Sequence, residues 1–314
     1  MDKISIIVPC YNEEETINIF YTEITKIASA LPDCDFEYIF VDDGSKDKTL
    51  AVAKELSKRD TKVKYISFSR NFGKESAMYA GLKAAKGDFV AIMDVDLQDP
   101  PSLIPEMYQT LKEEEYDCVA TRRVTRKGEP PIRSLFARMF YSIINKISDI
   151  ELVDGARDFR LMTRKYVNSL LELSENNRFS KGLFAWIGYK TKWLEYENIE
   201  RVAGETKWSF WKLFKYSLEG IVGFSTAPLY VSSITGIVMC IVAFLSIIFI
   251  IVRQLIFHDS VDGWASMACI TILLGGLVML FIGVLGLYLS KVYLEIKDRP
   301  IFISKEDNVS EEDK

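Results

Sequence analysis

Histidine and cysteine are scarce in this sequence of 314 residues, which has one histidine, His258, and five cysteines. A single histidine excludes a histidine-rich metal centre and argues against a catalytic triad of serine, histidine and aspartate. No two cysteines have the spacing of metal ligands, and Cys240 and Cys269 lie in apolar runs. We therefore expect reduced thiols in a protein that faces the cytosol.

The sequence also has no excess of positive charge, and we expect no secretory signal at its start. It has 39 basic and 44 acidic residues, a net charge of −5, which argues against a surface built to bind nucleic acid. Lys3 is followed at once by ISIIVP, a run too short for the apolar core of a secretory signal. We expect the fold to start there, on the side of the membrane where the chain is made.

Charged residues are absent from two long stretches near the C-terminus. None occurs in residues 220–252 and none in 263–290, and a helix needs about 20 apolar residues to cross a bilayer core. We predict membrane spans at about 229–252 and 267–290, with a buried hairpin in a soluble core as the alternative. Lysines and arginines flank the outer ends of this pair. The positive-inside rule then places both termini and the preceding domain in the cytoplasm of a cell-membrane protein.

Strand-like and helix-like segments alternate along the first 122 residues. Apolar runs that predict strands are followed by segments with apolar residues at helical spacing, such as Ile17, Phe20 and Ile24. This alternation predicts an α/β fold with a mostly parallel sheet and helices on both faces. The predicted strands are 4–9, 36–41, 62–68, 88–93 and 117–122, and the predicted helices are 13–31, 49–59, 75–87 and 102–115.

Four polar motifs stand where predicted strands end: CYNEE, DDGS, SRNFGKE and DVDLQD. In open sheets of this kind, ligands bind beyond the carboxyl ends of the strands. DVDLQD places Asp94, Asp96 and Asp99 within six residues, and carboxylates so close repel one another unless positive charge lies among them. Asp94 and Asp96, with Gln98, suit Mg²⁺ or Mn²⁺ shared with a diphosphate; a solvated loop is the alternative.

The other strand-end motifs suit a nucleotide. Tyr11 can stack on a base, and Asn12, Glu13 and Asp42 can hydrogen-bond to base or ribose. The alternative for DDGS is a turn followed by a helix cap, and one motif can serve both purposes. In SRNFGKE, Lys74 supplies positive charge for a diphosphate, with a plain surface turn as the alternative.

A second acidic motif, DGARDFRLM, places Asp158 beside Arg157 and Arg160. Nearby cations keep an aspartate ionised with a lowered pKa, which suits an electrostatic or base role toward an acceptor; a structural ion pair is the alternative. Segment 133–147 is amphipathic, and segment 207–220 is basic and aromatic, as in helices that lie in the membrane interface rather than end in a core. Arginines and lysines around these segments suit a phosphate at the membrane surface.

The order VPCYNEE, DDGS, RNFGKE, DVDLQDP, GARDFRLM and R-x-x-G-x-T-K before two spans resembles the polyprenyl-phosphate glycosyltransferases, family 2 enzymes of the GT-A fold. The likeness covers residues 3–300 and is strongest to the bactoprenol glucosyltransferase group, with dolichol-phosphate mannose synthase a cousin. It implies an inverting, metal-dependent transfer of a hexose to undecaprenyl phosphate. The implied donor is a nucleotide sugar, UDP-glucose or UDP-N-acetylglucosamine, and the implied assembly is a homo-oligomer such as a tetramer.

The resemblance, taken with the residue chemistry, assigns a role to each candidate residue. A lipid phosphate monoester is mostly ionised at pH 7, so we expect Asp158 to orient the acceptor or balance charge rather than act as an obligatory base. Arg157 stands where the family often has glycine, and Thr206 where it often has serine. The candidates are Asp158 and Asp96 for catalysis; Asp94, Asp96 and Gln98 for metal; Pro9, Tyr11, Asn12, Glu13, Asp42, Asp43, Lys74 and Asp94 for the nucleotide sugar; and Arg122, Arg133, Arg138, Arg201 and Lys207 for the acceptor phosphate.

The predicted layout has four parts. Residues 1–130 bind the nucleotide sugar, 131–219 bind the acceptor, 220–300 form the membrane region, and 301–314 form a polar tail whose last ten residues we expect to be disordered. Two other functions stay open. A processive polysaccharide synthase usually has a glutamine/arginine-rich-tryptophan motif and more spans, and neither is visible here. A non-catalytic membrane protein that binds lipid phosphate would not need the intact acidic motifs.

Overall fold

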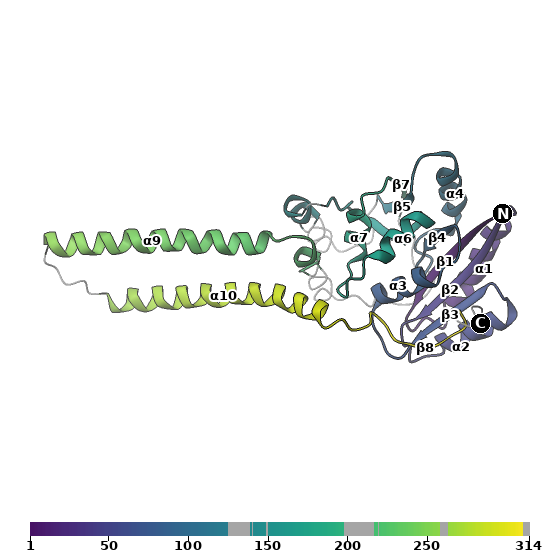
Figure 1. The fold of residues 1–314 in the computed structure, drawn as a ribbon, viewed down its shortest axis with the longest axis horizontal. Helices are drawn as coiled ribbons and strands as arrows, with labels where there is room; N and C mark the ends of the chain where they lie inside the picture. Colours follow the sequence, from purple (N-terminus) through teal and green to yellow (C-terminus); the bar gives the residue numbers. More distant parts are fainter. Residues whose placement is uncertain are drawn as a thin grey trace.

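The computed structural model describes residues 1–124, 139, 141–148, 150–197, 217–218, 220–257 and 263–309. These residues form an α/β domain from which two long helices project, and the chain returns to the domain after them (Figure 1). Six residues singled out from the sequence lie outside the described ranges: His258, Arg133, Arg138, Arg201, Thr206 and Lys207.

The centre of the domain is a mostly parallel sheet. Its strands are β1 (Asp2–Cys10), β2 (Cys34–Asp42), β3 (Val63–Phe68), β4 (Phe89–Ile92), β5 (Cys118–Arg123), β6 (Ala156–Thr163), β7 (Thr191–Tyr196) and β8 (Ser304–Asp307). They form an eight-stranded sheet in the order β7-β5-β6-β4-β1-β2-β3-β8. Neighbours in the β4-β1-β2-β3 group are parallel, and so are β5 and β7. By contrast, β6 is antiparallel to both its neighbours, and β8 is antiparallel to β3.

Helices cover both faces of the sheet, as the alternation predicted. Side chains of α1, α2 and α4 pack on one face, and those of α3, α6 and α7 pack on the other. The bounds of these helices are α1 (Ile17–Ser29), α2 (Thr49–Arg59), α3 (Lys74–Ala84), α4 (Ile104–Glu113), α6 (Arg164–Glu172) and α7 (Ser180–Trp186).

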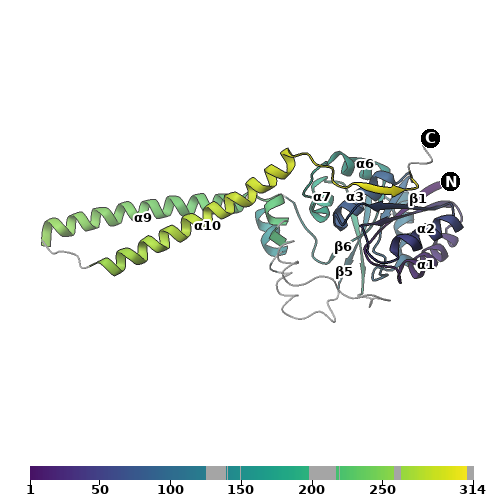
Figure 2. The same cartoon turned by 90° about the horizontal axis from the view of Figure 1, so that it is seen from below.

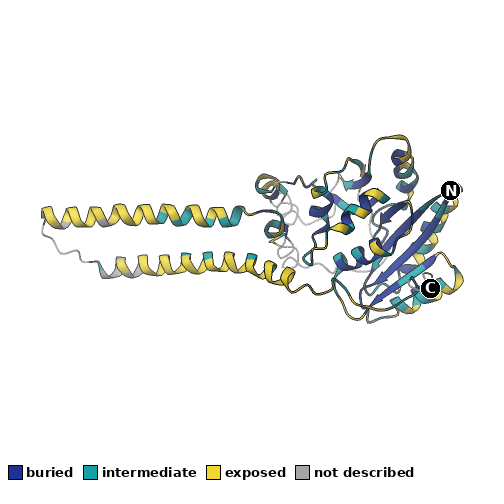
Figure 3. Ribbon diagram, viewed as in Figure 1, coloured by how far each residue is buried: buried dark blue, intermediate teal, exposed yellow. Residues whose placement is uncertain are grey.

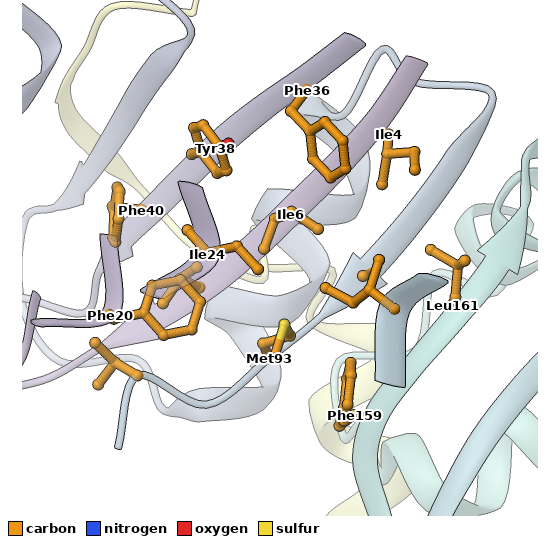
Figure 4. Close-up of a cluster of buried hydrophobic side chains, with 14 of the residues drawn as sticks. Ile4, Ile6, Phe20, Ile24, Phe36, Tyr38, Phe40, Met93, Phe159 and Leu161 are labelled. Atoms are coloured by element: carbon orange, nitrogen blue, oxygen red, sulfur yellow. The ribbon is translucent and has the colours of Figure 1, made fainter. Parts of the chain in front are cut away.

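The inner strands are buried on both faces, which explains their unbroken apolar runs. Side chains alternate along β1, so that Ile6 joins the core under α1 while Ile7 joins the core under α3. In the first of these cores, Phe20 of α1 meets Phe40 of β2 edge to face, with ring centroids 6.2 Å apart (Figure 4). This rigid double-sided core fixes the positions of the loops that follow the strands.

Two long helices, α9 (Ala227–Phe257) and α10 (Trp264–Ile296), extend away from the domain (Figures 1 and 2). At 1.5 Å per residue, the 31 residues of α9 span about 46 Å, which is enough to cross a bilayer core. The apolar stretches Ala227–Arg253 and Ile270–Ile296 are exposed along their length (Figure 3). So large an exposed apolar surface requires lipid or protein cover. Both predicted spans lie within these helices, which are long and apolar enough to cross a membrane.

The disorder predicted for the last ten residues, 305–314, is wrong for residues 305–309. Residues Ser304–Asp307 form β8, which pairs with the free edge of β3, and the side-chain Oδ1 of Asn308 accepts a hydrogen bond from the Tyr65 amide at 2.7 Å. Just before the strand, the ring of Phe302 stacks on Phe68, with centroids 4.9 Å apart. The composition of the tail is polar, but an open sheet edge offers backbone partners that composition does not reveal.

A small apolar cluster joins the domain to the start of α9. It contains Ile144, Leu152 and Phe179, against which Phe224 packs. Residues 141–147 are helical, with Ile144 buried and one face exposed, which agrees with the predicted amphipathic segment in its described part. The greater part of the segment 207–220 lies outside the described residues.

Candidate active site

The candidate active site lies at the carboxyl end of the four parallel strands β1 to β4. Because β6 runs in the opposite direction, its first residues reach this same end of the sheet. Ile92, the last residue of β4, pairs with Arg160 of β6. The residues after Ile92 therefore lie close to the residues before Arg160, and two acidic motifs far apart in the sequence come together.

Lys74, the first residue of α3, lies between these two acidic motifs. Its Nζ is 2.6 Å from Asp94 Oδ1 and 2.6 Å from Asp158 Oδ2. Burial opposes the charge on Lys74, but attraction by Asp158 and Asp94 outweighs it and raises the pKa of Lys74. Burial would likewise raise the pKa of Asp158, but Lys74 and then Lys181 hold it well below its ordinary value. Asp158 is therefore ionised at neutral pH, and its main partner is Lys74 rather than the adjacent arginines.

Arg157 supplies the second positive charge among the acids that follow β4. Its Nε is 2.9 Å from Asp99 Oδ1, and its Nη2 is 3.8 Å from Asp94 Oδ2. Asp99 is buried and also accepts a hydrogen bond from the hydroxyl of Tyr196 in β7. The positive charge that the acid-rich motif required is thus provided by Lys74 and Arg157, and Asp99 serves a structural ion pair.

The remaining carboxylate, Asp96, bears on metal binding. Leu97 has a φ of +55°, which turns the chain sharply, and Asp96 Oδ1 accepts a hydrogen bond from the Gln98 amide at 3.2 Å. Among the described residues, no group of three acidic, histidine or cysteine side chains could hold a metal ion by itself. One or two carboxylates suffice for Mg²⁺ when substrate phosphates and water complete its shell, so the pair Asp94 and Asp96 fits a shared ion. Bound there, such an ion would neutralise charge on a departing diphosphate.

At the same end of the sheet, side chains link the loop after β1 to the loop after β2. The amide of Asn12 donates to Ser45 Oγ at 2.9 Å, and Asn12 Oδ1 accepts from the Lys46 amide at 2.9 Å. The Glu13 amide donates to Thr49 Oγ1 at 2.8 Å. Asn12, with a φ of +53°, is therefore a loop anchor, whatever it offers a ligand. Pro9 and Tyr11 lie at this same strand end, half-buried.

The two aspartates of DDGS also hold loops. Asp42 Oδ2 accepts from Ser67 Oγ at 2.8 Å, and Asp42 Oδ1 accepts from the Ser45 amide at 3.0 Å. The carboxylate of Asp43 is buried and accepts from the amides of Phe72 and Gly73, at 2.6 and 2.9 Å. Burial raises the pKa of Asp43 to about 6, although these amide hydrogen bonds act in the other direction. The turn that the sequence left open as an alternative is present in this motif.

On the acceptor side, only one of the five predicted cations lies in the described residues. Arg122, at the end of β5, reaches across to β7, where its Nε is 2.9 Å from Glu195 Oε1. Arg160 of the acidic motif is buried and stacks on the ring of Phe184, with the guanidinium carbon 3.4 Å from the centroid. Neither arginine therefore presents an open charge to the acidic centre in this conformation.

Two residues of the site were not predicted from the sequence. Lys181 on α7 donates to the backbone oxygen of Ala156 at 2.9 Å, close to Asp158. Glu75 of α3 accepts hydrogen bonds from the amide of Ser180, at 3.0 Å, and from its hydroxyl, which fixes α7 beside α3. Lys181 belongs to no motif that the sequence analysis singled out, and Glu75 ends SRNFGKE without a predicted role; the packing of α7 against α3 brings the two together.

The comparisons with known proteins identify the family of the chain. The family model described as glycosyl transferase family 2 matches residues 5–171, which contain most of β1 and all of β2 to β6, and the chain belongs to this family. This confirms the predicted family and the GT-A class of fold, and it defines the protein as a glycosyltransferase.

Among individual relatives, the prophage bactoprenol glucosyl transferase homolog of Escherichia coli (strain K12) is 41% identical over 96% of this chain and 98% of its own. The bactoprenol glucosyl transferase of Shigella phage SfV is 40% identical over 97% and 99%. Glucosyl-3-phosphoglycerate synthase from Mycobacterium tuberculosis, solved with Mn²⁺, uridine-diphosphate-glucose and phosphoglyceric acid, is 22% identical, with a TM-score of 0.46 over 70% of this chain and 78% of that one. That last likeness is too distant to assign a role to any residue here.

Proposed function

We propose that the protein transfers a hexose from a nucleotide sugar to polyprenyl (undecaprenyl) phosphate at the cytoplasmic face of the cell membrane, with inversion at the sugar. UDP-glucose and UDP-N-acetylglucosamine are the proposed donors. The observation that carries the proposal is the ionised centre of Asp94, Lys74 and Asp158 in a domain joined to two exposed apolar helices. Full-length relatives named bactoprenol glucosyl transferase support the same acceptor.

The donor would bind across the ends of β1, β2 and β4. Asp94 and Asp96, with Gln98 beside them, would share Mg²⁺ or Mn²⁺ with the diphosphate, and Lys74 would add positive charge. The loops after β1 and β2 would hold the nucleotide, because they are already locked together by internal hydrogen bonds. The proposed contacts on these loops are Pro9, Tyr11, Asn12, Glu13, Asp42 and Asp43.

The acceptor phosphate would attack the sugar directly. A phosphate oxygen forms a bond to the anomeric carbon while the bond from that carbon to the diphosphate breaks, and the electron pair leaves with the nucleotide diphosphate. The lipid phosphate, whose second pKa is about 6, is mostly dianionic at pH 7 and needs no base. Asp158, held ionised by Lys74, has too low a pKa to be an effective base at this pH, so we assign it to orientation and charge balance.

The membrane arrangement follows from the helix pair. α9 leaves the domain and α10 returns to it, so the domain and the C-terminal strand β8 would lie on one side of the membrane, the cytoplasmic side. In α10, an added methyl group at Gly275, Gly276 or Gly283 would meet open space. Small residues of this kind suit close helix packing, so we propose a homo-oligomer with the spans bundled.

The test is a panel of radiolabelled nucleotide sugars with the purified protein and purified undecaprenyl phosphate. We expect one labelled sugar per lipid phosphate with a UDP-hexose, and no labelled lipid when undecaprenol replaces the phosphate. A long polysaccharide product would support the processive synthase instead. Tight binding of lipid phosphate without transfer from any donor would support the non-catalytic alternative.

A further inference from the structure

Lys181 differs from the other cations of the described site in how little of its hydrogen-bonding capacity is used. Its Nζ donates to the Ala156 backbone oxygen at 2.9 Å, and within the described ranges it forms no ion pair. An ammonium group carries three donors, so two remain for another acceptor. Lys74, by contrast, contacts both Asp94 and Asp158 at 2.6 Å, and Arg157 is paired with Asp99.

The position of Lys181 links the acidic centre to the membrane. Residues 176–181, which we call the bridge segment, begin at the C-terminal end of α10: the amide of Asn176 donates to Glu295 Oε1 at 3.1 Å, and Lys291 Nζ donates to Asn177 Oδ1 at 2.5 Å. The bridge segment ends at Lys181. Two residues earlier it contains Phe179, which belongs to the apolar cluster that joins the domain to α9. Figure 1 shows α7 on the side of the domain from which α9 and α10 project.

The chain beside Lys181 packs into the apolar cluster at the start of α9. Phe179, two residues before Lys181, is buried, with its ring centroid 5.9 Å from that of the half-buried Phe224, and Phe224 also lies against Gly182. A phosphate bound at Lys181 would therefore lie next to the cluster that joins the domain to the first apolar helix. On the other side, the positive charge of Lys181 is near enough to Asp158 to stabilise its ionised form.

We propose that Lys181 binds the phosphate of the lipid acceptor and holds it beside Asp158 for attack on the sugar. This inference rests on the proposed function. It assigns to the acceptor a cation that no sequence motif marks, carried by a segment anchored at one end on α10 and at the other, through Ser180, on Glu75 of α3. The two free donors of Lys181 match the oxygens of a phosphate monoester.

The test compares Lys181→Gln with Lys181→Arg. Glutamine removes the charge but keeps a donor for the Ala156 oxygen, whereas arginine keeps the charge. We expect Lys181→Gln to raise KM for undecaprenyl phosphate by roughly tenfold to a hundredfold, with KM for the nucleotide sugar and the melting temperature little changed. Lys181→Arg should restore most of the affinity. The matched control is Lys165→Gln on α6, an exposed lysine that follows the opposite end of β6, and it should behave as wild type.

A second readout is direct binding of undecaprenyl phosphate and of undecaprenol in detergent, without donor. Wild type should prefer the phosphate, and Lys181→Gln should lose most of that preference. If wild type neither prefers the phosphate nor transfers sugar to it, the proposed function fails and this inference fails with it. If wild type does both and Lys181→Gln keeps the wild-type KM for the acceptor and the wild-type preference, only the assignment of Lys181 is overturned. A variant with equally weakened donor and acceptor binding and a lowered melting temperature would also overturn it, because Lys181 would then only hold α7 in place.

Discussion

The carboxylates in the two halves of the site are held by different kinds of hydrogen-bond donor. At the end of β2, Asp42 and Asp43 accept hydrogen bonds from backbone amides and a hydroxyl of neighbouring loops. At the ends of β4 and β6, Asp94 and Asp158 are held by the side-chain ammonium of Lys74. Backbone donors cannot leave without disrupting the loop, but a lysine on a flexible stem can change partners. The loops at the end of β2 are therefore fixed before a ligand binds, whereas the charged side chains at the ends of β4 and β6 can exchange partners when it binds.

Removing the divalent ion should have the largest effect, because the ion would bind the carboxylates after β4, in the half of the site that exchanges partners. We expect a chelator such as EDTA to lower sugar transfer by at least about a hundredfold, since the single charge of Lys74 cannot by itself offset the charge on the departing diphosphate. The measurement is labelled lipid product with EDTA, and then with excess Mg²⁺ or Mn²⁺ added back. Full activity in EDTA, together with harmless alanine substitutions at Asp94 and Asp96, would contradict the metal assignment.

Replacing Asp158 with asparagine should have the next largest effect. We expect kcat to fall by roughly a hundredfold, because the orienting charge beside Lys74 is lost, while nucleotide binding measured by calorimetry stays intact. Because the pKa of Asp158 lies well below its ordinary value, it stays ionised across pH 5–8 and contributes no limb to the activity profile there. Any fall in rate below about pH 6 should belong to the lipid phosphate and persist in the variant. Unchanged turnover would reject a catalytic role.

Asp43 sharpens the comparison through stability rather than activity. Its folded pKa of about 6 lies above the ordinary 3.8, so the folded protein holds the proton more tightly than the unfolded chain does. Stability from this group is therefore fully present below about pH 4 and is lost as pH rises toward 6, by about 1–3 kcal/mol. Thermal unfolding in detergent should show this slope in wild type, and Asp43→Asn should flatten it. The same slope in both proteins would contradict the assignment.

The smallest effect is expected at β8, the edge strand that β3, β2 and β1 separate from β4. Lys54 Nζ is 2.5 Å from Glu306 Oε2 of β8, and each side chain is about one-third exposed. An exposed pair of this kind contributes less than about 1 kcal/mol, so Glu306→Gln should shift the melting temperature by no more than a few degrees and leave transfer unchanged. A large loss of activity would show that β8 controls the loop after β3 and that the edge strand and the active site are not independent.

Much of the fold was predictable because it depends on local pattern. The strands predicted at 4–9 and 36–41 lie within β1 and β2, since residues buried on both faces of a parallel sheet give unbroken apolar runs. The strand β8 was not predictable, because its sequence is polar and its pairing depends on an edge supplied by a distant part of the chain. The position of β6 between β4 and β5 was not predictable for the same reason, because it depends on pairing with strands from distant parts of the chain.

The sequence by itself determined the class of fold, the two apolar helices, and the acidic motifs at the strand ends, because periodicity, length and residue type are local properties. Only the tertiary structure decided which cation meets which acid. Lys74 reaches Asp158, Arg157 turns to Asp99, and Lys181 arrives on a helix that no motif marks. The physical reason is that an antiparallel strand beside β4 and a helix packed on α3 bring together residues from separate parts of the chain, and charge pairs form between groups that are neighbours in space.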